Sequence, residues 1–315
     1  MEIDKAYCIE LNDEVTPYQA KYAFFDDNNT YEKFHFKCVT CDAEIYGANI
    51  YIEALRKQRP NFRTMPRHIH EINCPYKTSE EGSSDNHEGH HGSPKRFKGS
   101  PFPTELMLHV KWDGEGAKNG LNKDLDAEES DKNKKEKRSP TDKYSEGPTR
   151  TGIFEFVVDC FERATEEQKN TYSLTIGNKT KSYAAYFMSV KDFQDEKGLI
   201  YYGFINKKRF KKLNDGYRIV FEDMVSHNGK KLSISLYVSK KSIEFHRKKR
   251  YFELNMDKIL SLSPNEEAMC YFVGYYPCLK GVPLKNNPSE KFLIYDAEIK
   301  NPNHLVIKFS DTGSR

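Results

Sequence analysis

The sequence FHFKCVTC (residues 34–41), followed by RHIHEINC (residues 67–74), carries the side chains on which the fold of the N-terminal region depends. Its cysteine pair is separated by two residues, and its histidine–cysteine pair by three. Three thiolates and one imidazole form the closed tetrahedral coordination of structural zinc. The alternative interpretation is ordinary reduced thiols and a surface histidine. We therefore predict one structural Zn2+ with these ligands: Cys38, Cys41, His70 and Cys74, with His68 as the alternative imidazole.

The residues around these ligands predict a small module over 1–78. Short aromatic-rich runs at 6–11, 21–25 and 33–38 are typical of strands. Residues 49–57 favour a strand or a short helix. Because so little apolar material cannot by itself stabilise a domain of this size, the module needs the metal. The 28 residues between Cys41 and His70 favour a zinc ribbon with a strand insert.

Composition predicts a flexible segment after this module. Only 37% of the 315 residues are hydrophobic, and 31% are charged. Residues 79–150 are dominated by Gly, Ser, Lys, Glu and Asp, a composition that cannot bury enough apolar surface to offset its ordering entropy. Within this flexible, charged linker, residues 102–112 alternate apolar and polar side chains up to the chain's only tryptophan, Trp112. We predict that they form a strand that joins a sheet of a folded domain.

Residues 151–315 predict a second, β-rich domain with helices at its N-terminus. Apolar residues in 153–164 recur at helical spacing, and a second short helix is expected over 182–190. Strand patterns follow at 198–205, 216–223, 231–239, 269–277, 292–299 and 304–309. The predicted fold class is therefore α+β: a zinc-ribbon module, a flexible linker, and a C-terminal domain built as an OB-like barrel or a curled antiparallel sheet.

The segment from FHFKC to HEINCPY resembles the zinc-ribbon segment of CoiA-like bacterial proteins. In that family a C-x2-C pair precedes a phenylalanine-containing stretch and a closing H-x3-C, places taken here by Cys38, Cys41, Phe62, His70 and Cys74. The resemblance covers about 45 residues. It implies DNA-related work in bacteria, such as competence, mobile-element biology or antiviral defence. The family's nuclease-type domain has no residue match here, so nuclease activity is not implied.

Charge is distributed unevenly along the chain. The net charge is +3, but residues 151–315 hold 27 Lys and Arg against 20 acids, and residues 206–250 hold 14 against four. Cations that neutralise phosphates, interleaved with aromatic rings that stack on bases, are typical of nucleic-acid binding, and we expect DNA rather than RNA. The alternative is an adaptor whose zinc ribbon and linker recruit a protein effector. The predicted contacts are Lys207, Lys208, Arg209, Phe210, Lys211, Lys212, Tyr237, Arg247, Lys248 and Arg250.

Evidence for catalysis is weak in the sequence. Asp296, Glu298 and Lys300 could belong to a Mg2+-dependent nuclease, but alternating charge on an exposed strand is the simpler explanation. Glycine-rich phosphate loops and a G-x-S-x-G elbow are absent from the sequence. No run approaches 18 apolar residues, and the N-terminus does not resemble a secretory signal. We therefore expect a cytoplasmic protein with reduced cysteines, no membrane partner and no enzymatic activity.

Overall fold

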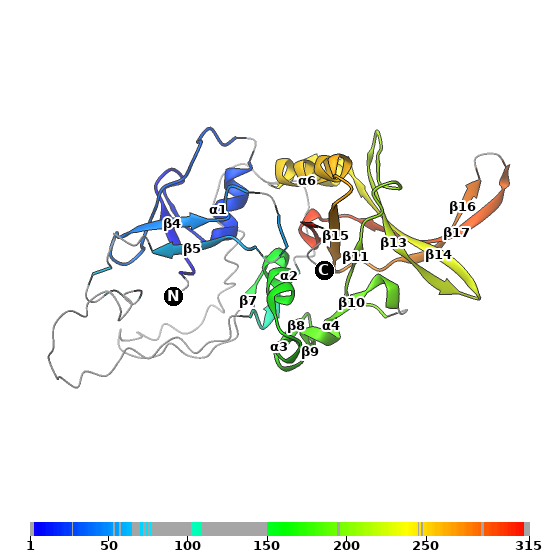
Figure 1. The fold of residues 1–315 in the computed structure, drawn as a ribbon, viewed down its shortest axis with the longest axis horizontal. Helices are drawn as coiled ribbons and strands as arrows, with labels where there is room; N and C mark the ends of the chain where they lie inside the picture. Colours follow the sequence, from blue (N-terminus) through cyan, green and yellow to red (C-terminus); the bar gives the residue numbers. More distant parts are fainter. Residues whose placement is uncertain are drawn as a thin grey trace, which may run out of the picture.

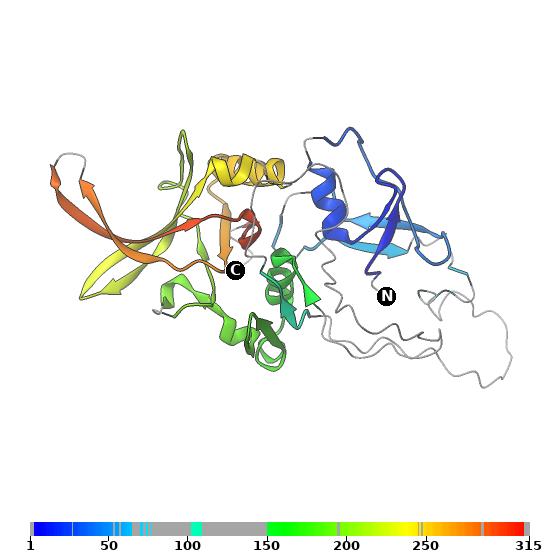
Figure 2. The same cartoon turned by 180° about the vertical axis from the view of Figure 1, so that it is seen from behind.

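The chain folds into a mixed α+β structure rich in strands (Figures 1 and 2). The computed structural model describes residues 3–26, 28–52, 54–56, 58–64, 70, 71, 74, 76, 102–108, 150–193, 196–244, 246, 248–284 and 287–311. These residues form four sheets. None of the helices in the described ranges combines the length and the apolar character that crossing a bilayer requires. Most of the predicted linker and the alternative ligand His68 lie outside the described residues.

The N-terminal region forms a five-stranded sheet in the order β2-β1-β3-β4-β5. All four neighbouring pairs are antiparallel. A separate hydrophobic core lies under this sheet and includes Phe34, Phe36, Ile45 and Phe62. The strands are β1 (Ala6–Cys8), β2 (Asp13–Val15), β3 (Phe36–Lys37), β4 (Glu44–Ala48) and β5 (Asn61–Thr64).

The predicted strand over 21–25 is wrong, because these residues belong to helix α1 (Pro17–Phe24). Thr16 caps the helix: its side chain accepts the Gln19 N–H, and the Gln19 side chain accepts the Thr16 N–H. Pro17 at the first helical position has a backbone angle suited to a helix start and no N–H to leave unpaired. The described residues of the stretch 49–57 form neither a strand nor a helix, apart from one isolated bridge at Leu55.

The C-terminal region contains two larger sheets whose inner faces share one hydrophobic core. The four-stranded sheet has the order β10-β11-β15-β18, and the five-stranded sheet has the order β12-β13-β14-β17-β16. The first comprises β10 (Phe187–Ser189), β11 (Ile200–Phe204), β15 (Glu266–Phe272) and β18 (Leu305–Asp311). The second comprises β12 (Lys211–Lys212), β13 (Gly216–His227), β14 (Lys230–Ser239), β16 (Cys278–Leu284) and β17 (Asn287–Ile299).

The expected OB-like barrel or single curled antiparallel sheet is not what the described strands form. They lie in separate sheets, and the pairs β10–β11 and β14–β17 are parallel. A parallel pair needs a long crossover. Between β14 and β17 the chain passes through α5 (Lys240–Glu244), α6 (Lys249–Ser261), β15 and β16. Helix α6, which was not predicted, packs Phe252, Met256 and Ile259 into the shared core.

The predicted helices and the predicted linker strand are only partly as expected. Helix α2 (Phe154–Arg163) is confirmed, whereas 182–190 divides into α4 (Tyr183–Tyr186), β10 and the 3-10 turn η1 (Val190–Asp192). Within 102–112 the strand is β6 (Glu105–Leu106), and residues 109–112 lie outside the described residues. Strand β6 pairs with β7 (Arg150–Thr151) and β8 (Ser173–Ile176), and β9 (Lys179–Ser182) completes this sheet. The remaining short elements are α3 (Glu166–Thr171) and η2 (Pro302–His304).

The N-terminal region contacts the C-terminal region directly, in addition to any linker between them. Residues 54–56 lie beside the edge strand β18, where Leu55 and Phe309 form a parallel bridge. The Arg56 N–H donates to the Phe309 carbonyl (2.9 Å), and the Phe309 N–H donates to the Ala54 carbonyl (3.0 Å). The Arg56 guanidinium also pairs with Glu162 of α2 at 2.9 Å. The N-terminal region thus covers a sheet edge that would otherwise expose unpaired backbone groups.

A group of charged side chains is buried where α1, α2 and β18 meet. We call it the buried ionic cluster: Lys21, Glu155, Asp159 and Lys308, each at most 3% exposed. The Lys308 ammonium lies 2.8 Å from Glu155 and 2.7 Å from Asp159. From α1, the Tyr22 hydroxyl donates to Glu155 (2.6 Å) and the Tyr18 hydroxyl to Asp159 (2.5 Å). These bonds offset the cost of removing charge from water, and they join the two regions.

Candidate metal centre and basic sheet face

Two of the predicted metal ligands lie on a tight turn between β3 and β4. The Cys38 N–H donates to the Ala43 carbonyl (2.7 Å), and the Asp42 N–H donates back to the Cys38 carbonyl (3.2 Å). Asp42 adopts φ +57°, a left-handed conformation in which aspartate is tolerated better than most residues. The two-residue spacer therefore brings the thiols of Cys38 and Cys41 to one side of the turn.

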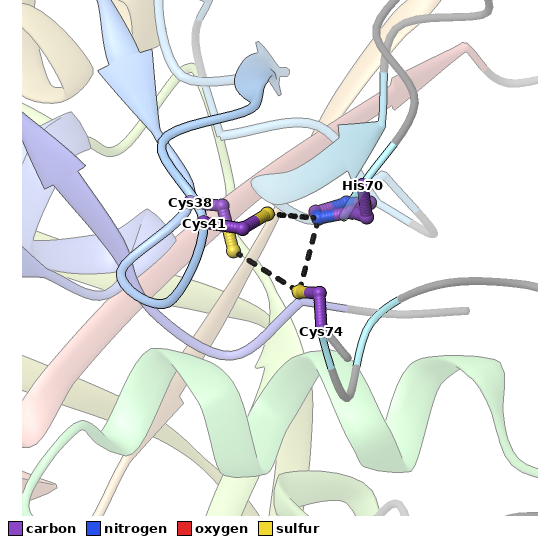
Figure 3. Close-up of side chains that lie close together, drawn as sticks. All are labelled: Cys38, Cys41, His70 and Cys74. Atoms are coloured by element: carbon purple, nitrogen blue, oxygen red, sulfur yellow. Dashed lines mark hydrogen bonds between the residues drawn. The ribbon is translucent and has the colours of Figure 1, made fainter. Parts of the chain in front are cut away.

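The other two ligands approach from the segment that follows β5 (Figure 3). The Nδ1 atom of His70 lies 3.2 Å from the Cys41 sulfur and 3.3 Å from the Cys74 sulfur. The Cys38 and Cys74 sulfurs are 3.7 Å apart. On the far side of the imidazole, Nε2 lies 3.3 Å from the Thr64 hydroxyl of β5. A partner on the second nitrogen fixes the ring orientation, as is usual for metal-binding histidines.

The donor set and its spacing fit a tetrahedral zinc ion. Zinc–sulfur bonds of about 2.3 Å and zinc–nitrogen bonds of about 2.0 Å place neighbouring ligand atoms of a tetrahedron about 3.5 to 3.8 Å apart. All four ligand atoms lie within 4.8 Å of one another, and the closest pairs are 3.2 to 3.7 Å apart. Three of the four residues are buried. The four predicted residues therefore converge on a site that could hold a metal ion, with Thr64 orienting the imidazole.

The protonation of the thiols bears on what this site can bind. Burial raises the pKa of Cys74 to about 12. Burial acts in the same direction on Cys41, but backbone hydrogen bonds at Ala43 and Glu71 and contacts with the other thiols bring its pKa below the ordinary value. Buried thiols at this spacing can all ionise only if a cation compensates them, and a divalent metal ion does so by direct coordination.

The predicted nucleic-acid contacts do not form one surface. Phe210 is 5% exposed and belongs to the core, so its predicted role in base stacking is wrong. Lys207 donates to the Ser263 and Glu266 carbonyls (2.8 and 2.9 Å), and Lys212 pairs with Asp257 of α6. Lys248 lies 3.7 Å from the centre of the Tyr22 ring, at the contact with α1. Arg250 is exposed on α6, Lys208 is exposed, and Arg247 lies outside the described residues.

The remaining predicted contacts, Arg209, Lys211 and Tyr237, lie on one face of the five-stranded sheet of the C-terminal region. Along β14, Ile234, Leu236 and Val238 point into the core, so the alternate residues point the other way. Register extends this face to the neighbouring strands: Lys211 lies opposite Arg218, Arg218 opposite Tyr237, and Ser235 opposite Asp296. We call it the outer face. It carries Arg209, Lys211, Arg218, Lys231, Ser233, Ser235, Tyr237, Lys280, Phe292, Ile294, Asp296 and Glu298.

Positive charge is in excess on the outer face. Asp296 accepts Arg218 (3.0 Å), Lys280 (2.9 Å) and the Ser235 hydroxyl (2.6 Å). Two cations therefore share one carboxylate. Arg209 reaches the same face and donates to the Ser233 hydroxyl (2.8 Å). Lys211 and Lys231 are exposed and pair with no carboxylate among the described residues.

The weak catalytic candidates do not assemble a metal site. Asp296 and Glu298 share one face of β17 and Lys300 directly follows the strand, but the cations described above already hold Asp296. The only group of metal-binding side chains found among the described residues is the Cys38, Cys41, His70 and Cys74 cluster. Among the described residues, Asp296 therefore belongs to no group of side chains that could hold Mg2+.

Comparison with known proteins adds no relative. No protein-family model matches the chain, and neither a curated protein nor a solved structure matches it. The resemblance to CoiA-like proteins therefore stays a prediction that rests on the residues quoted above.

Proposed function

We propose that the chain is a cytoplasmic nucleic-acid-binding protein whose N-terminal region is a zinc ribbon held by Cys38, Cys41, His70 and Cys74. In this proposal the metal is structural, since three thiolates and one imidazole leave no open coordination position. The C-terminal region binds the nucleic acid. The CoiA-like resemblance favours DNA and a role in bacterial antiviral defence or mobile-element biology.

The observation that carries the proposal is the excess of cations on the outer face. Among the residues of this face that the structure describes, the cations Arg209, Lys211, Arg218, Lys231 and Lys280 outnumber the acids Asp296 and Glu298. A phosphate backbone binds such a surface by displacing its condensed counterions, and each contact makes the affinity depend on salt. The lysines that lack a carboxylate partner gain most from a phosphate, because they break no existing ion pair.

A salt titration of oligonucleotide binding tests the proposal. We expect the logarithm of the association constant to fall linearly with the logarithm of salt concentration, with a slope of about 0.7 to 0.9 per phosphate contact. Replacing Lys211 and Lys231 by glutamine should reduce this slope by roughly one to two. Lys191→Gln, an exposed lysine in η1, is the matched control and should leave it unchanged. Binding that is absent at low salt contradicts the proposal.

The adaptor alternative predicts a different result. In that case replacing Lys211 and Lys231 by glutamine would leave oligonucleotide binding unchanged, or the wild type would show no such binding. A protein complex would instead form through the N-terminal region. The same variants therefore distinguish the two functions.

A further inference from the structure

Two arginine side chains lie across the centre of the outer face, over the serines of β14. Strand β14 presents Ser233 and Ser235 there, between Lys231 at one end and Tyr237 at the other. Both serines are buried, so a ligand that approaches this part of the face meets the side chains that lie over them. The two arginines that cover these serines, Arg209 and Arg218, are held by hydrogen bonds to their hydroxyls at 2.8 and 3.3 Å.

Aromatic rings lie at both ends of this central part of the outer face. Tyr237 is fixed by its hydroxyl, which donates to the Asp215 carbonyl (3.0 Å), and the Arg218 guanidinium lies 5.6 Å from the centre of its ring. An arginine stacked on a tyrosine presents a second planar surface on which a base can stack. At the other end, Phe292 of β17 is 42% exposed. Figure 1 shows β16 and β17 projecting from the body of the molecule.

The positions of these rings set the length of strand that would bind. Tyr237 lies opposite Glu298, which is six residues from Phe292 along β17. At about 3.3 Å per residue, the two aromatic positions are about 20 Å apart. One base cannot contact both. Lys280, opposite Ile294, and the Arg209 guanidinium at Ser233 lie between the two rings, and the Arg218 guanidinium reaches from the Tyr237 row to Ser235. A strand of several nucleotides could place bases on the rings and phosphates on the cations.

We infer that the outer face binds single-stranded nucleic acid, with bases stacking on Phe292 and on the Tyr237–Arg218 pair. This inference rests on the proposed function and specifies its substrate class. In a duplex the faces of the bases are stacked on each other and only their edges are accessible in the grooves. Rings on an open sheet reach base faces only when the bases are unstacked, as in other sheets that bind single strands.

Fluorescence anisotropy with three probes tests the inference: a 12-nucleotide dT strand, a 12-nucleotide rU strand, and a 12-base-pair DNA duplex. We expect one or both single strands to bind more tightly than the duplex. Phe292→Ala and Tyr237→Ala should each weaken single-strand binding by about 5- to 150-fold, the usual effect of removing one stacking ring. Their effect on the duplex should be small. Phe292→Trp and Tyr237→Phe keep a stacking ring and should bind like the wild type.

Leu279→Ala is the matched control. Leu279 lies on the same hairpin, is 40% exposed, and lies opposite Tyr295, which places it on the other face of the sheet. It should bind all three probes like the wild type, and circular dichroism should show that every variant is folded.

The possible outcomes separate the inference from the proposed function. If the duplex binds as tightly as the single strands, or if the two alanine variants bind normally, the single-strand inference is wrong while the nucleic-acid function stands. If no probe binds at low salt, both are wrong. If an acidic peptide of matched charge competes as well as the dT strand does, the face is a general polyanion surface, and the stacking role is again wrong.

Discussion

Replacing Lys308 by methionine should strongly destabilise the protein, because it removes the cation that two buried carboxylates share. The side chain is 0% exposed and lies within 2.8 Å of both Glu155 and Asp159. Methionine has nearly the same length and fills the same space, so the change removes the charge and little packing. Breaking a buried pair by removing one partner costs about 3 to 5 kcal/mol, because the remaining charge stays buried.

The two carboxylates are not equally protected from this loss. Glu155 would keep Tyr22, Tyr251 and the Lys21 ammonium at 3.9 Å. Asp159 would keep only the Tyr18 hydroxyl among the contacts described above. Asp159 should therefore carry most of the cost.

This difference predicts how the effect depends on pH. Burial already raises the pKa of Asp159 above its ordinary value, and Lys308 opposes that rise. In Lys308→Met the Asp159 pKa rises further, so protonation of the folded state relieves the cost as the pH falls. The loss of unfolding free energy should be largest near pH 8 and smaller near pH 5.

Urea denaturation followed by circular dichroism measures these effects. Lys300→Met, at an exposed position directly after β17, is the control and should stay within about 0.5 kcal/mol of the wild type. The double variant with Asp159→Asn should recover part of the loss. A loss below about 1 kcal/mol for Lys308→Met, or one independent of pH, would refute the view that these carboxylates are ionised and held by Lys308.

The remaining predictions concern the metal, the half-buried Lys248 and a core ring. Mass spectrometry of the native protein should find one zinc per chain; Cys74→Ser should lose it, whereas Cys278→Ser, at an exposed cysteine outside the cluster, should retain it. Burial lowers the pKa of Lys248 to about 8 from 10.5, with Glu155 opposing the shift and Lys21 adding to it. From pH 8 to about 9.5 the Lys248 ammonium keeps its proton in the unfolded chain but loses it in the folded protein, so the free energy of unfolding should rise over this range. Lys248→Met should lack this rise in urea melts. Phe210→Ala should cost about 3 to 5 kcal/mol in the same assay, because the ring is buried; a near-neutral change would contradict the structure.

The metal-ligand cluster could be predicted from the sequence because its spacing is local. Cys38 and Cys41 lie on one turn, and the short H-x3-C segment brings His70 and Cys74 together whatever the rest of the chain does. The strands of the C-terminal region were predictable for a similar reason, since the alternation along β14 and the apolar run of β18 are properties of each segment alone. The sheet order and the parallel pairing depend on contacts between distant segments, and no local pattern specifies them.

The failures have the same physical origin. Residues 21–25 contain enough aromatic side chains for a strand, but the capping signal at Thr16 and Pro17 lies upstream and decides for a helix. Lys308 sits in an apolar run and looks like an ordinary strand lysine, because its carboxylate partners are about 150 residues away on α2. Phe210 and Phe292 are both aromatic residues near cations. Helix α6 and the inner sheet faces bury the first, and the second remains exposed on the projecting hairpin.

Helix α1 connects the core around Cys38, Cys41, His70 and Cys74 to the C-terminal region, because it has two packed faces. Ala20 and Phe24 pack in the core that also contains Cys38 and Cys74, whereas Tyr18 and Tyr22 donate to the buried carboxylates of α2. Anything that loosens the small N-terminal core therefore also weakens the hydrogen bonds that compensate buried charge on α2. The metal would accordingly stabilise more than the module that binds it, and the two regions would lose structure together when it is removed.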